Sequence, residues 1–156
     1  MTLRALAITI GLAATLTQTA IGDEQKMTAD YGVAHDAPLR TKIESFGQTA
    51  QTGARLELAS LTDFPWDKVI PVQSSAPLEL YAKLTGSSDW LTTERGQAVS
   101  DESVMLVFMD QDRVVAAPVI APPIWIMGAD PVPHGREAAL VVTSPGPGSY
   151  AHLTLE

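Results

Sequence analysis

Cysteine is absent from this 156-residue chain. Without it the protein can form no disulfide bond, no thiolate metal site and no thiol nucleophile, and it lacks the lipid-bearing cysteine of a lipoprotein. We therefore expect no thiol chemistry and no lipid anchor.

Basic residues are few. Lys and Arg together number 10 against 18 Asp and Glu, which gives a formal net charge of −8. Such a surface repels phosphate backbones and anionic lipids, and it favours a basic partner over an acidic one. We therefore expect no nucleic acid partner.

Long hydrophobic runs are missing beyond the N-terminus. The longest candidate, residues 114–127, is interrupted by Pro118, Pro122 and Pro123. A transmembrane helix needs roughly 20 consecutive apolar residues and tolerates such breaks poorly. We therefore expect no membrane insertion of the mature protein.

The N-terminus has the pattern of a secretory signal. Arg4 precedes an apolar stretch over residues 5–16, which is too short to span a bilayer. Small residues favour cleavage after Gly22, with a cut after Ala20 as the alternative. The sequence thus predicts a signal peptide over residues 1–22 and a periplasmic or secreted protein.

The remaining chain is long enough for one domain. Residues 23–37 are polar with little periodicity, which indicates an extended or disordered lead-in. Residues 38–156 predict a single α+β domain, an antiparallel sheet of about five to six strands with one or two short helices on one face.

Two segments have helical periodicity. Apolar residues at spacings of four, three and four predict a helix over about residues 38–50, with Pro38 in its first turn. A second helix is expected over about residues 75–86, where Ser75 can cap the start and Gly86 ends the helix.

Strand patterns fill much of the remainder. Alternation over residues 54–61 predicts a half-buried strand. A strand over residues 68–72 contains Pro71, which cannot donate a ladder hydrogen bond, so this strand should be an edge strand or should end there.

Two hairpins and one irregular segment follow. Apolar strands flank the polar turn at residues 110–112, and a closing hairpin pairs residues 137–144 with 150–156. Between the hairpins, the proline-rich residues 118–135 predict a long ordered excursion without a regular element.

No metal or cofactor site is expected. His35, His134 and His152 are the only histidines, and none has a partner at a spacing that would place two ligands on one element. Asp110 and Asp112 lack the further ligands of a calcium loop, so they are predicted to serve the hairpin turn.

No catalytic residue is assigned. The serines near the C-terminus lie in a turn rich in Pro and Gly, outside any Gly-x-Ser-x-Gly context. Asp63 and Asp67 flank Trp66, so one alternative is a hydrolase or carbohydrate-active domain using dispersed carboxylates near Trp66 or Trp90. Solvated acids around one buried aromatic residue explain the same pattern.

The cluster at residues 62–72 is interpreted as a structural anchor. Phe64 and Trp66 supply buried area that a small domain needs, and Asp67 can accept hydrogen bonds from the backbone or from Lys68 at the turn.

The best candidates for partner contact lie in the proline-rich segment. Ile124, Trp125, Ile126 and Met127 are consecutive, and in an extended chain their side chains alternate and cannot all enter one core. Trp125, Met127 and Ile124 are therefore the predicted contact residues. The alternative is that the segment folds back over the sheet as a lid.

Residues 64–69 form a Phe-x-Trp-Asp-basic-apolar stretch. It resembles a strand-opening motif of small exported bacterial proteins of unknown function. The similarity continues through a short helix, a Trp and an apolar strand with a polar turn, so it spans about residues 56–116. In those proteins an aromatic segment follows the motif. This chain has Pro71, Val72 and Gln73 in that place. The resemblance implies a fold and a compartment.

These patterns favour a non-enzymatic periplasmic or secreted domain that binds an unknown protein or envelope component, as an inhibitor or an accessory factor. The support comes from the acidic charge and the apolar segment around Trp125.

Overall fold

Two four-stranded sheets and four helices form the part of the chain that the structure, a computed structural model, describes: residues 33–85, 94–146 and 149–156. The predicted signal peptide and most of the predicted lead-in lie outside these residues, as do Gly86 and Trp90. The helices are α1 (Val33–Thr49), α2 (Leu58–Leu61), α3 (Leu78–Thr85) and α4 (Glu94–Ala98).

The predicted α+β class is confirmed, but the strands are divided between two sheets and do not form one. The first sheet has the order β1 (Arg55–Glu57), β7 (Ala139–Ser144), β8 (Ala151–Leu155), β6 (Ile124–Met127). In the second sheet, β3 (Val104–Asp110) pairs with β2 (Lys68–Gln73), β4 (Arg113–Ala116) and β5 (Val119–Ile120). Among the described strands, β6 and β8 form the one parallel pair.

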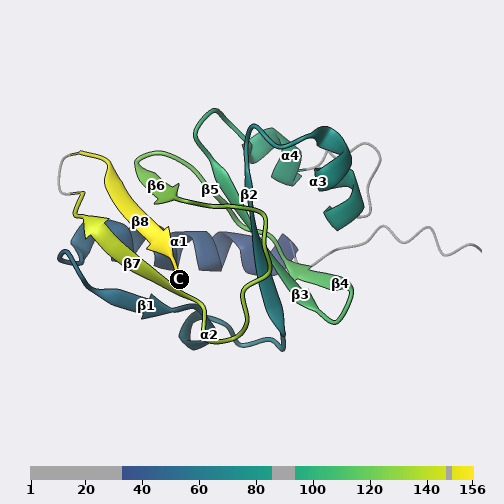
Figure 1. The fold of residues 1–156 in the computed structure, drawn as a ribbon, viewed down its shortest axis with the longest axis horizontal. Coiled ribbons are helices and arrows are strands. Elements are labelled where there is room, and N and C mark those ends of the chain that lie inside the picture. The colour runs from purple at the N-terminus through teal and green to yellow at the C-terminus, as the bar shows by residue number, and fades with distance from the viewer. Residues whose placement is uncertain (1–32, 86–93, 147–148) are drawn as a thin grey trace, which may run out of the picture.

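Helix α1 lies behind both sheets (Figure 1). Its buried residues Leu39, Ile43 and Gly47 are spaced four apart, so they share one face of the helix. That face contacts β6 and β8 of the first sheet and β4 and β5 of the second. One helix therefore joins the two sheets through a common core.

Gly47 lets α1 approach the first sheet closely. A Cβ atom on this residue would lie 2.7 Å from Cδ1 of Ile124 and 3.5 Å from Cβ of Ala151. The lack of a side chain is therefore a packing requirement at this position of the helix.

Strand β3 is buried on both faces. Val104, Leu106 and Phe108 face the core that contains α1, whereas Met105, Val107 and Met109 face a second core. This arrangement explains the uninterrupted apolar run in the sequence, since a strand covered on both sides has no polar face.

The second core lies between the second sheet and α3. Tyr81 of α3 is fully buried there, and the partly buried Leu80 and Leu84 pack against the same core. The Tyr81 hydroxyl donates a hydrogen bond to the carbonyl of Gln73 at the end of β2. Burial raises the pKa of Tyr81 above its usual value of 10.0.

The predicted hairpins are confirmed. Strands β3 and β4 pair antiparallel across a turn at Gln111 and Asp112, where Gln111 has φ = 57°. Strands β7 and β8 form the closing hairpin.

The prediction for Pro71 is also confirmed, because β2 is an edge strand. Val69 exchanges backbone hydrogen bonds of 2.8 and 2.9 Å with His134 on the side away from β3. Pro71, two residues further along the strand, faces the same side, so its missing N–H costs no bond to β3.

Two predicted boundaries are wrong. Helix α1 begins at Val33, inside the predicted lead-in, so Pro38 lies in its second turn. Asp36 holds the first turn through tertiary hydrogen bonds that periodicity cannot reveal. The predicted strand at residues 54–61 ends at Glu57, and α2 follows because Leu58 and Leu61, three apart, fit a helical turn.

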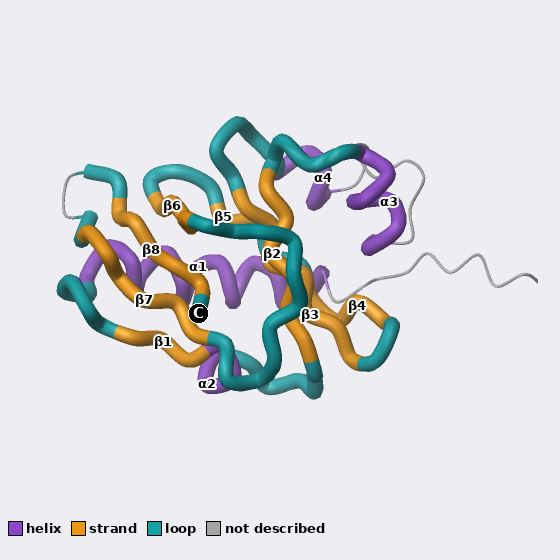
Figure 2. The backbone as a smooth tube through the Cα atoms, in the orientation of Figure 1, coloured by secondary structure: helices purple, strands orange, loops and turns teal. Residues whose placement is uncertain are grey.

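The predicted irregular excursion at residues 118–135 is also wrong in part, because it contains β5 and β6. Beyond β6, a loop crosses in front of the second sheet on its way to β7 (Figure 2). The pairing of His134 with Val69 fixes this loop against β2.

We expect Gly47→Val to lower the free energy of unfolding by about 1–3 kcal/mol, since the added atoms must displace Ile124 within a packed core. Urea denaturation measures the change. Ser45→Val is the matched control, because Ser45 is exposed on the same helix, and it should stay within about 0.5 kcal/mol of the wild type. Equal stabilities for the two variants would contradict the close packing.

We expect Tyr81→Phe to cost about 1 kcal/mol at neutral pH through the lost hydrogen bond. Because the folded-state pKa of Tyr81 is raised, its protonated form stabilises the fold below pH 10 and this contribution is lost as the pH rises further. The stability advantage of the wild type over Tyr81→Phe should therefore shrink above about pH 10 in urea titrations. If the difference in unfolding free energy between the wild type and Tyr81→Phe stayed constant up to about pH 11, the burial assigned to Tyr81 would be refuted.

Candidate functional site

The outer face of the first sheet carries two of the predicted contact residues. Trp125 and Met127 of β6 lie beside His152 and Thr154 of β8 in the parallel register. Met127 is 47% exposed and Trp125 is half-buried. The side chains of β6 alternate as the sequence predicts for an extended chain.

Ile124, the third predicted contact residue, does not lie on this face. It is 1% exposed and packs against Gly47 of α1 in the main core. Because side chains alternate in a strand, the same geometry that exposes Met127 turns Ile124 inward.

Trp125 belongs to an aromatic cluster at this face. Its ring centroid lies 5.8 Å from that of Tyr150 and 5.6 Å from that of His152, both in tilted orientations. Tyr150 is 50% exposed. These contacts hold the Trp125 ring in place while leaving part of the cluster accessible.

A hollow of about 250 Å³ adjoins this face. Trp125 to Gly128 form one wall, and the ends of β2 and β3 with the adjoining loops form the other through Gln73, Ser74 and residues 102–104. The two walls therefore come from different sheets.

A second hollow, of about 200 Å³, shares one lining residue, Gln73, with the first. It lies between residues 129–131 and the start of α3, where Ala76, Pro77 and Leu80 contribute apolar surface. We call the two together the β6 groove.

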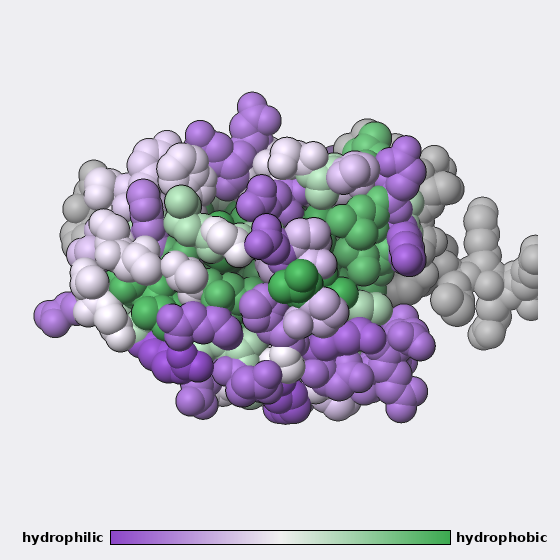
Figure 3. Space-filling model, in the orientation of Figure 1, coloured by the Kyte–Doolittle hydropathy of each residue, from purple (hydrophilic) through white to green (hydrophobic). Residues whose placement is uncertain are grey.

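Apolar residues line part of both hollows, among them Ile126 and Met127 in the larger and Leu80 in the smaller. Figure 3 shows two hydrophobic areas on this face of the molecule, one over β7 and β8 and one between β3 and α3, within a polar surround. The charged residues that line the hollows are Glu102 and Asp130, both acidic. The groove thus combines apolar walls with negative charge.

Most of the groove could not be predicted from the sequence. Gln73, Glu102 and Asp130 lie far apart in the chain, and only the tertiary fold brings them to one site. The alternation in the closing strand could have placed Tyr150 and His152 together on one face, beside whichever strand paired with it.

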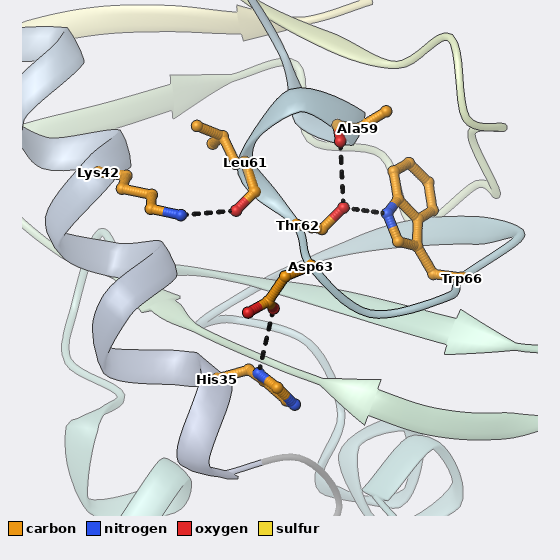
Figure 4. Close-up of polar contacts among 7 residues, drawn as sticks. All are labelled: His35, Lys42, Ala59, Leu61, Thr62, Asp63 and Trp66. Carbon is orange, nitrogen blue, oxygen red and sulfur yellow. Dashed lines mark hydrogen bonds and ion pairs between the residues drawn. The ribbon is translucent and has the colours of Figure 1, made fainter.

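Trp66 lies in the main core, away from solvent. It is 3% exposed, and its ring packs edge-on against Phe108 at a centroid distance of 5.2 Å. Its indole N–H donates to Oγ1 of Thr62 at 2.9 Å (Figure 4). Arg136 covers the ring at 4.9 Å and donates to the Trp66 carbonyl at 2.9 Å. Trp66 therefore offers no open face on which a sugar could stack.

The neighbours of Trp66 have separate contacts. Phe64 is half-buried between His35 and Phe108, at centroid distances of 4.4 and 6.1 Å. Asp67 is exposed and accepts a hydrogen bond from the Gln111 N–H at 3.2 Å. Lys68 instead lies 3.6 Å from Asp112. Asp67 thus ties the start of β2 to the turn between β3 and β4.

The three histidines lie in different surroundings. His35 is on α1, 3.8 Å from Asp63 (Figure 4), His134 pairs with β2, and His152 faces outward from β8. No group of three or more His, Asp or Glu residues that could hold a metal occurs within the described ranges.

We expect Trp66→Ala to lower the free energy of unfolding by about 3–5 kcal/mol, because it removes a large buried ring from the core. Asp63→Ala is the matched control, since this nearby side chain is 91% exposed. Thermal melting of both variants measures the difference. An unchanged melting temperature for Trp66→Ala would show that Trp66 does not anchor the sheet.

No helix within the described residues is long and apolar enough to span a membrane. No protein family model, curated protein or solved structure matches this chain. The resemblance to small exported bacterial proteins therefore stays a prediction, and function has to be inferred from the β6 groove.

Proposed function

We propose that the protein is a non-enzymatic binding domain that holds another protein at the β6 groove. The observation that carries this proposal is the position of Trp125 and Met127, which are accessible on an otherwise packed strand beside the groove. Aromatic residues and Met are enriched at protein interfaces, where a few such side chains supply most of the binding energy.

Pre-organisation supports the same proposal. Trp125 packs against Tyr150 and His152, and β6 is fixed from behind by the contact of Ile124 with α1. A side chain that is already held in place loses little conformational entropy when a partner binds. The Trp125 ring is therefore suited to act as a rigid anchor.

The place of action in this proposal is the periplasm or the outside of the cell. It rests on the signal-peptide pattern of residues 1–22. An inhibitor or an envelope accessory factor would both fit such a location.

The alternative of a carbohydrate-active domain has less support. Its proposed contact at Trp66 is covered by Arg136 and buried against Phe108. Trp90, the other candidate, lies outside the described residues. The binding domain is therefore the function that we put forward.

The experiment is affinity capture of the partner from the cell envelope, quantified by mass spectrometry. We expect the double variant Trp125→Ala/Met127→Ala to recover at least about tenfold less of the partner than the wild type, because it removes both proposed anchors. Leu78→Ala is the control: Leu78 is 51% exposed and does not line the groove. Undiminished recovery by the double variant, or no enrichment by the wild type, would contradict the proposal.

A further inference from the structure

We infer that the segment held in the β6 groove is an extended, basic and apolar stretch of a partner protein, which adds as a strand to the free edge of β6 at Ile126. This inference rests on the proposed function and specifies its ligand class. Strand addition is a common way for a sheet edge to bind a peptide, because backbone hydrogen bonds supply affinity and alternate side chains supply specificity.

The pairing of β6 fixes which backbone groups are free. The Ala151 N–H donates to the Pro123 carbonyl at 2.9 Å, so Pro123, Trp125 and Met127 direct their backbone groups toward β8. Ile124 and Ile126 direct theirs to the opposite side. The Ile124 N–H donates to the Ala121 carbonyl, whereas the register leaves the N–H and C=O of Ile126 without a strand partner among the described residues.

Ile126 lies in the wall of the larger hollow. Its side chain points into the main core and the residue is only 5% exposed. Backbone donors and acceptors of a strand in a folded protein are normally hydrogen-bonded. A strand in the groove would give Ile126 both of its missing bonds.

The edge is short, which limits the register of a bound strand. Pro122 and Pro123 precede β6, and Gly128 follows it with φ = 65°. Short edges flanked by proline are typical of strands that are protected from unspecific pairing. The bound segment therefore pairs at Ile126 and places its side chains in the flanking hollows.

Charge selects the partner. Glu102 lines the larger hollow and Asp130 the smaller one, and neither lining includes Lys or Arg. A basic segment complements this lining. A second copy of the chain, with a formal net charge of −8, would instead bring like charges together.

The test uses the synthetic pentapeptide acetyl-Val-Lys-Val-Lys-Val-amide, titrated calorimetrically into the protein. Two further peptides carry N-methyl groups on all the Val residues or on both Lys residues, which blocks one or the other edge of the extended peptide. Only one edge of the extended peptide can donate a hydrogen bond to Ile126. We therefore expect one methylated peptide to have a Kd at least about tenfold higher than the parent peptide, and the other to have a Kd within about threefold of the parent's.

A peptide with Glu in place of Lys should bind at least about tenfold weaker than the parent. Equal binding by both methylated peptides would overturn strand addition, and equal binding by the Glu peptide would overturn the charge preference. Absence of saturable binding by the parent peptide would overturn the inference as a whole. The proposed function fails separately, when Trp125→Ala/Met127→Ala leaves capture of the partner protein unchanged.

Discussion

The packing of α1 across both sheets is the constraint on which the other features depend. At one end of this contact, Gly47 allows the helix to meet Ile124 of β6. At the other end, Asp36 accepts a hydrogen bond of 2.7 Å from the Ala117 N–H, just after β4, and forms a largely buried ion pair with Arg95 at 2.6 Å. Because the helix is rigid between these ends, it fixes the position of one sheet relative to the other.

The groove follows from this arrangement. Its walls belong to different sheets, with β6 on one side and the ends of β2 and β3 on the other. The contacts of α1 with both sheets therefore help to set the distance between the two walls. Burial of β3 on both faces adds to the rigidity of the second wall, because its side chains join both cores.

Local features of the fold could be predicted from the sequence, and non-local ones could not. Both hairpins were predictable because their strands are adjacent in the chain and a polar turn joins them. An extended chain at residues 124–127 implies alternating side chains, which fits Trp125 and Met127, but the strand itself and the inward position of Ile124 were not predicted. The parallel pairing of β6 with β8 could not be predicted, because these strands are separated by β7 and no periodicity reveals a partner. The acidic lining from Glu102 and Asp130 depends on the same tertiary arrangement.

Amide hydrogen exchange of the free protein, measured residue by residue by NMR, shows whether the packed fold leaves one backbone edge of β6 unpaired. The N–H groups of Trp125 and Met127 bond to β8, so they should exchange slowly. The Ile126 N–H lacks a strand partner and should exchange at least about a hundredfold faster than its two neighbours. Equal protection of all three amides would show that the edge is already paired, which would contradict the account of the groove.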